Sequence, residues 1–90
     1  MLRMPRYFLE RDLGEVTRVE LDAIAERSQE IRAARYPQIT WEHTHVVRTP
    51  GGQRAFCLYE APDAASVQRH AAELGLPLER FYEVETDLEP

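Results

Sequence analysis

The chain lacks, or has very little of, several features, and their absence narrows the range of functions that it could have. It has no lysine, so all eleven basic residues are arginine. Its single cysteine, Cys57, excludes a disulfide within the chain and is typical of a protein kept in a reducing compartment. No apolar run approaches the ~18 residues of a membrane span, and no secretory signal pattern opens the chain. We therefore expect a cytoplasmic protein with no membrane partner.

The common motifs of catalytic and phosphate-binding sites are also missing. The sequence has no Gly-rich phosphate loop, no CxxC pair, no HExxH motif and no Ser-His-Asp signature. Its formal net charge of -5 disfavours nucleic acid, because an acidic surface repels phosphates. The segment from Arg54 to Tyr59 faintly resembles the aromatic strand of an RNA-recognition domain, but the chain has no basic patch to accompany it. We expect no nucleic-acid partner.

Length and composition indicate one folded domain. The hydrophobic content of 43% is ordinary for a globular domain. A length of 90 residues leaves no room for a second core. We predict a single domain over residues 1–90, with residues 1–3 as a dispensable N-terminal extension.

Capping residues locate two helices. Thr17-Arg18-Val19-Glu20 is a capping box, and Pro37 ends the helix that follows at or just after Arg35. Asp63 is the expected N-cap of a second helix, with Gly75 and Pro77 just beyond its last residue, Leu74. The chain thus predicts helices near 17–35 and 63–74.

Four strands are predicted around these helices. Residues 6–11 are predicted to form the first strand and residues 80–88 the last, and residues 39–48 and 53–60 form a hairpin around a turn at 49–52. In the predicted register His45 faces Phe56, His43 faces Leu58 and Trp41 faces Glu60. Strict alternation places five residues on one face of the first hairpin strand: Ile39, Trp41, His43, His45 and Val47.

This order of elements predicts the fold class. Strand, helix, hairpin, helix, strand is the βαββαβ order of the ferredoxin-like α+β fold, whose antiparallel sheet carries both helices on one face. We expect the strand order 4-1-3-2. The open face would then expose Trp41, Phe56 and Leu58, so we predict a homodimer that covers it, similar to a dimeric α+β barrel.

The residues that could ligate a metal are few. His43 and His45 share a strand face two residues apart, and the register adds Glu60 to that face. Imidazole and carboxylate form a mixed ligand set suited to nickel, zinc or copper. A one-residue change of register would bring Cys57 to that face instead. His70 lies at the edge of the apolar stripe of the second helix.

Several segments resemble one small bacterial family of nickel-binding proteins with a ferredoxin-like fold. The resemblance covers the chain from Met4 to about Pro90 and rests on four segments: Met4-Pro5-Arg6-Tyr7, Trp41-Glu42-His43-Thr44, Cys57-Leu58-Tyr59-Glu60-Ala61-Pro62-Asp63 and His70-Ala71. It implies a dimer and a nickel ion bound at the dimer surface. His43, Cys57, Glu60 and His70 fall on family motif positions, whereas His45 stands where such proteins more usually have an aromatic residue.

Two functional hypotheses follow. The first is a non-catalytic protein that binds nickel, or another divalent transition metal, for metal handling or sensing, with His43, Glu60, His70, His45 and Cys57 as candidate ligands. The alternative is an enzyme of the dimeric α+β-barrel kind, similar to monooxygenases or isomerases, that acts on a small aromatic molecule. In that case His43, His70 and Glu60 would be acid-base groups around an apolar pocket.

Overall fold

The computed structural model describes residues 4–76 and 78–90. The predicted extension at residues 1–3 and the predicted role of Pro77 therefore lie outside the described residues. Six elements follow one another in the predicted order: β1 (Arg6–Gly14), α1 (Arg18–Arg35), β2 (Thr40–Thr49), β3 (Gly52–Glu60), α2 (Ala64–Leu74) and β4 (Arg80–Glu83). No helix among the described residues is both long and apolar enough to cross a membrane.

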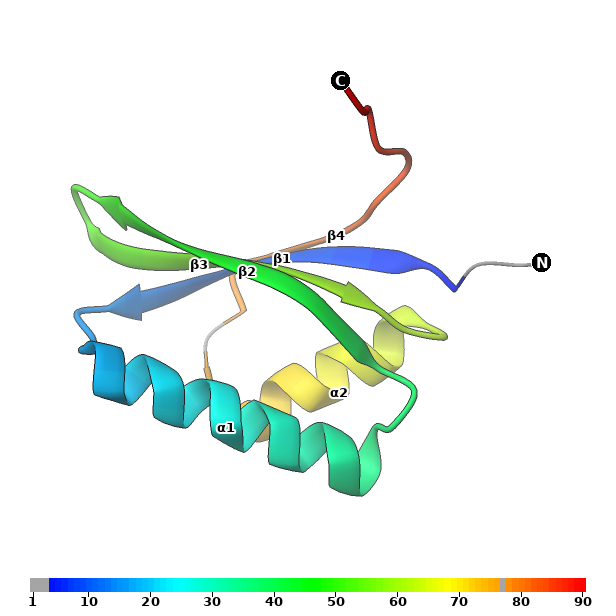
Figure 1. Ribbon diagram of the computed structural model, residues 1–90, viewed down its shortest axis with the longest axis horizontal. Helices are drawn as coiled ribbons and strands as arrows, with labels where there is room; N and C mark the ends of the chain where they lie inside the picture. Colours follow the sequence, from blue (N-terminus) through cyan, green and yellow to red (C-terminus); the bar gives the residue numbers. More distant parts are fainter. Residues whose placement is uncertain (1–3, 77) are drawn as a thin grey trace.

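The four strands form one antiparallel sheet. Its order is β2-β3-β1-β4, which is the predicted order read from the other edge. Both helices lie on one side of the sheet (Figure 1). This α+β arrangement is compatible with the ferredoxin-like fold.

Local capping explains where the helices begin and end. The backbone amide of Glu20 donates to Thr17 Oγ at 3.1 Å, and the amide of Thr17 donates to the Glu20 carboxylate at 3.0 Å. Asp63 accepts from the amide of Ser66 at 2.7 Å. Gly75 ends α2 with a φ of 78°, a left-handed conformation that glycine adopts without a Cβ penalty. The predicted capping box and caps are confirmed.

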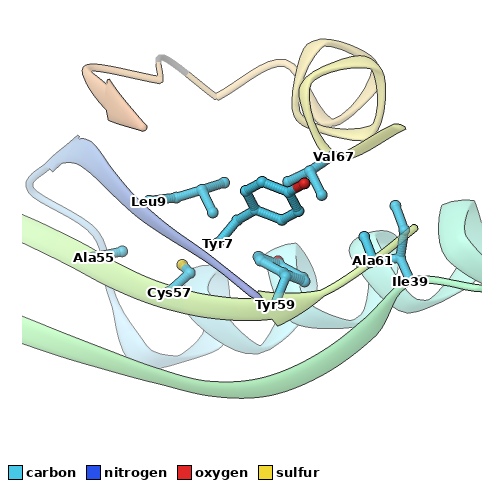
Figure 2. Packing of buried hydrophobic residues seen from close by; sticks show 8 residues of the cluster. All are labelled: Tyr7, Leu9, Ile39, Ala55, Cys57, Tyr59, Ala61 and Val67. Atoms are coloured by element: carbon cyan, nitrogen blue, oxygen red, sulfur yellow. The ribbon is translucent and has the colours of Figure 1, made fainter. Parts of the chain in front are cut away.

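The hydrophobic core lies between the sheet and α2. Tyr7 and Leu9 of β1 point toward Val67 of α2, and Tyr59 of β3 lies beside them (Figure 2). Leu9 and Val67 have no exposed surface. By contrast, the buried residues of α1 are Ser28, Ile31 and Arg32, of which two are polar. α2 therefore packs more apolar side chains against the sheet than α1 does.

The hairpin register is confirmed up to His43 and then departs from the prediction. His45 pairs with Phe56 and His43 with Leu58, but Trp41 pairs with Tyr59 rather than with Glu60. Glu42 is an extra residue at this point, so the strand has a β-bulge there.

The bulge turns Trp41 to the helix side, which corrects the prediction that Trp41 shares a face with His43. On that side the Trp41 ring lies 5.6 Å from the Arg32 guanidinium, and its Nε1 donates to Thr44 Oγ at 2.8 Å. Glu42 instead accepts from Arg6 Nε at 2.8 Å. Partners from α1 and β1 thus hold the two neighbouring side chains in opposite directions.

The first and last strands of the chain also differ in length from their predictions. β1 continues to Gly14, and β4 ends at Glu83 instead of Leu88. The amide of Val84 donates to the carbonyl of Arg6, the first residue of β1. Beyond that bond β1 offers no further backbone partner, so β4 ends.

Candidate functional site

The sheet separates the five predicted ligands into two groups. Along β3, alternation turns Ala55, Cys57 and Tyr59 toward the helices, where they are buried. Phe56, Leu58 and Glu60 therefore face the open side. Their register partners bring His43 and His45 to the same open side. His70 belongs to α2, on the helix side, where it has no exposed surface.

His43 and His45 are in contact on the open side. Their ring centroids are 4.2 Å apart, and His43 Nε2 lies 3.4 Å from His45 Nδ1. Both residues are exposed. At this distance one ring nitrogen can donate to the other, and the tautomers of the two rings determine which one donates. Nitrogens of neutral imidazole rings are also common metal ligands.

The spacing of these two nitrogens suits a single metal ion. Two nitrogens that each lie about 2.0–2.1 Å from a metal are about 2.9 Å apart at a right angle and about 3.4 Å apart at a tetrahedral angle. The observed 3.4 Å falls at the upper end of that range. The distance between the two nitrogens is therefore compatible with both of them ligating one ion.

The remaining predicted ligands do not complete a site within one chain. Glu60 shares the open face, but among the residues that the structure describes no group of three His, Cys, Asp or Glu side chains could hold a metal ion. Cys57 and His70 lie on the other side of the sheet, so they cannot bind the same ion as His43 in one protomer.

His70 occupies a very different environment. Its Nε2 lies 3.2 Å from Ser28 Oγ, and its ring lies edge-on to Tyr36 and Tyr59 at 6.0 and 5.8 Å. Burial lowers the pKa of His70 to about 4; the Ser28 hydrogen bond opposes this effect, and the positive charges of Arg32 and Arg11 add to it. His70 is therefore a neutral core residue at physiological pH.

The rest of the open face combines aromatic side chains with ion pairs. Phe8 lies beside Phe56, with ring centroids 6.0 Å apart, and pairs across β1 and β4 with Tyr82. Phe8 is 38% exposed and Tyr82 56% exposed. The Glu10 carboxylate accepts from Arg54 Nε at 2.6 Å and from Arg80 Nη1 at 3.1 Å. The hydrogen bond from Arg54 is the main reason why the pKa of Glu10 is lowered.

A cavity of about 350 Å³ lies on the other side, between α1 and the sheet. Among the described residues, its lining includes Cys57 but not His43, His70 or Glu60. The three acid-base groups of the enzyme hypothesis therefore do not surround it.

Sequence reasoning missed Arg11, a charged residue in the wall of this cavity that is only 2% exposed. A signal for its position was present, because Arg11 alternates with the buried Tyr7 and Leu9 along β1.

The fold and the exposed histidine pair define a small α+β domain with two adjacent imidazole rings on its open face. Comparison with known families then places the chain. The family model described as "Nickel responsive protein SCO4226-like" matches residues 7–84, nearly the whole chain. The chain belongs to this family, as its sequence resemblance predicted. No curated protein and no solved structure matches it.

Proposed function

We propose that the protein binds nickel through His43 and His45 on the open face of the sheet, in metal handling or sensing. The observation that carries this proposal is the 3.4 Å contact between His43 Nε2 and His45 Nδ1. Neutral imidazole is a good ligand for nickel, zinc and copper, and two imidazoles on one ion chelate it. Membership of a family named for its response to nickel supports the choice of metal.

Glu60 is the proposed third contributor, because it emerges on the same face as the histidine pair. Water, or ligands of a second protomer, would complete the coordination sphere. His70 and Cys57 are not part of this proposal, since both are buried on the opposite side of the sheet. The first hypothesis from the sequence is thereby narrowed from five candidate ligands to three.

We also propose that two copies associate through the open face. Phe8 and Tyr82 form an exposed aromatic area on β1 and β4. Val47, which is 40% exposed, lies on the same face at the opposite edge of the sheet, on β2. Exposed apolar areas of this kind are typical of interaction surfaces. A twofold axis through this face would bring each histidine pair toward the partner protomer, since the same patch is used twice.

Calorimetric titration with Ni²⁺ tests the metal proposal, on protein without a polyhistidine tag. His43→Ala and His45→Ala should each weaken binding at least about tenfold, about 1.4 kcal/mol, because either change removes chelation. Val46→Ala is the control on the same strand but on the helix side, and it should bind nickel as wild type does. Copper(II) should bind at least as tightly as nickel. Wild-type affinity in both histidine variants would place the site elsewhere.

Sedimentation velocity at micromolar concentration tests the assembly. The wild type should sediment as a dimer, and Phe8→Arg should shift it toward the monomer by placing a charge at the centre of the apolar area. Val19→Arg is a suitable control, because Val19 is 78% exposed on α1, away from the open face. A monomeric wild type, with or without Ni²⁺, would contradict the proposed dimer.

A further inference from the structure

The cavity on the helix side is separate from the proposed nickel site. It lies between α1 and the strands β2 and β3, and its volume of about 350 Å³ is sufficient for a small molecule. The walls are mainly apolar and include Leu21 and Ile24 of α1 and Val46 of β2. Trp41, the only tryptophan of the chain, also lines it because the bulge at Glu42 turns its ring to this side.

Arg11 brings an uncompensated charge into this apolar space. Its Nη1 and Nη2 atoms are buried and have no hydrogen-bond partner among the described residues. Arg11 also takes part in none of the ion pairs formed by residues 4–76 and 78–90. An isolated buried charge costs several kcal/mol unless an opposite charge or hydrogen bonds compensate it.

A second buried arginine lies next to two residues of the cavity wall, Trp41 and Tyr59. Arg32 is 5% exposed, and its guanidinium lies over the rings of Trp41 and Tyr59 at 5.6 and 5.9 Å. The lining residues of the cavity that the structure describes include no aspartate or glutamate. The carboxylate of Asp22 lies beside the wall but is paired with Arg18, which lines the cavity. An anion next to Arg11 would therefore meet a positive charge that no carboxylate of the wall opposes.

We propose that this cavity binds a small apolar monocarboxylate, with its carboxylate on Nη1 and Nη2 of Arg11 and its hydrocarbon part against the apolar wall. The two terminal nitrogens of a guanidinium match the two oxygens of a carboxylate and hold it by paired charge-assisted hydrogen bonds. A phosphate monoester fits less well, because its higher charge needs more donors than one guanidinium within an apolar wall. The ligand satisfies the two donors that the protein leaves unpaired.

Fluorescence of Trp41 reports on the cavity, and 4-phenylbutyrate with its uncharged analogue 4-phenylbutanol is a matched pair of probes. Wild type should bind the acid saturably in the micromolar to millimolar range and the alcohol at least about tenfold more weakly, since a hydrogen bond to a charged group contributes about 1.5–3 kcal/mol. Arg11→Met keeps the length of the side chain and should bind acid and alcohol alike. Arg48→Met, at an exposed arginine paired with Glu15, should keep the preference for the acid.

Equal binding of acid and alcohol by wild type would overturn the proposal, as would a preserved preference for the acid in Arg11→Met. Absence of binding to 4-phenylbutyrate, phenylacetate and octanoate alike at millimolar concentration would also overturn it. Ile24→Trp provides an independent test should Arg11→Met fail to fold. It fills the cavity from α1 and should abolish binding of the acid in calorimetry, where retained binding would contradict the proposed location. Nickel titration of the same variant should be unchanged, which separates this site from the metal site.

Discussion

The histidines of the two sides of the sheet show how differently one residue type can be used. His43 and His45 stand in solvent with their ring nitrogens 3.4 Å apart. His70 has no exposed surface, contacts Ser28 and lies edge-on to the rings of Tyr36 and Tyr59. The sequence presents all three as candidate ligands. Burial and the side of the sheet divide them into an accessible pair suited to a metal and a neutral residue that fills the core.

The largest expected effect concerns the stability contributed by His70. Replacing His70 with alanine leaves a hole beside Tyr36 and Tyr59, so the free energy of unfolding should fall by about 2–4 kcal/mol. His43→Ala, at an exposed strand position, should change it by no more than about 0.5 kcal/mol. Urea denaturation of the two variants measures the contrast. Equal losses in both would show that the two environments do not differ as described.

Lowering the pH should reveal a further consequence of the burial of His70. Since the pKa of His70 is about 4 in the folded protein and about 6.5 when unfolded, the unfolded chain takes up the proton first. Stability contributed by His70 is therefore lost as the pH falls from about 6.5 through about 4, by about 3 kcal/mol at most.

Urea denaturation at a series of pH values measures this loss, with His70→Phe as the control. That variant keeps a ring in the core but cannot titrate, so it should lose less stability than wild type over the same pH range. Parallel curves for the two proteins would mean that His70 is protonated in the folded state as readily as in the unfolded chain.

The smallest effect is expected at the bulge. Glu42→Ala removes an ion pair to Arg6 near the surface, which is worth at most about 1 kcal/mol. Contacts of Trp41 with Arg32 and Thr44 should keep the ring on the helix side and so preserve the bulge that precedes His43. Nickel affinity should therefore stay within about twofold of wild type. Calorimetry and the emission maximum of Trp41 check this. A large loss of nickel affinity would contradict this expectation and show that the histidine pair depends on the Glu42–Arg6 ion pair.

Much of the fold could be predicted because its signals are local. The Thr17 capping box, the Asp63 cap and Gly75 are each determined by a few neighbouring residues, and all three are present in the structure. The turn at 49–52 similarly determined the hairpin register as far as His43.

The bulge and the cavity could not be predicted in the same way, because they depend on residues distant in sequence. Glu42 and Trp41 are directed by Arg6 and Arg32, which no local pattern pairs with them. The burial of Arg11 depends on α1 and β2 enclosing the space around it. The histidine pair was visible as an i, i+2 pattern, whereas the exclusion of Cys57 and His70 from its face required the sheet itself.

The imidazole resonances of the three histidines, followed by nitrogen-15 NMR during a titration with Ni²⁺, test the central claim most directly. Bound Ni²⁺ is paramagnetic and broadens the signals of its ligands. The account predicts that the signals of His43 and His45 disappear together at substoichiometric nickel while those of His70 persist. Early loss of the His70 signals, with those of His43 and His45 retained, would contradict it.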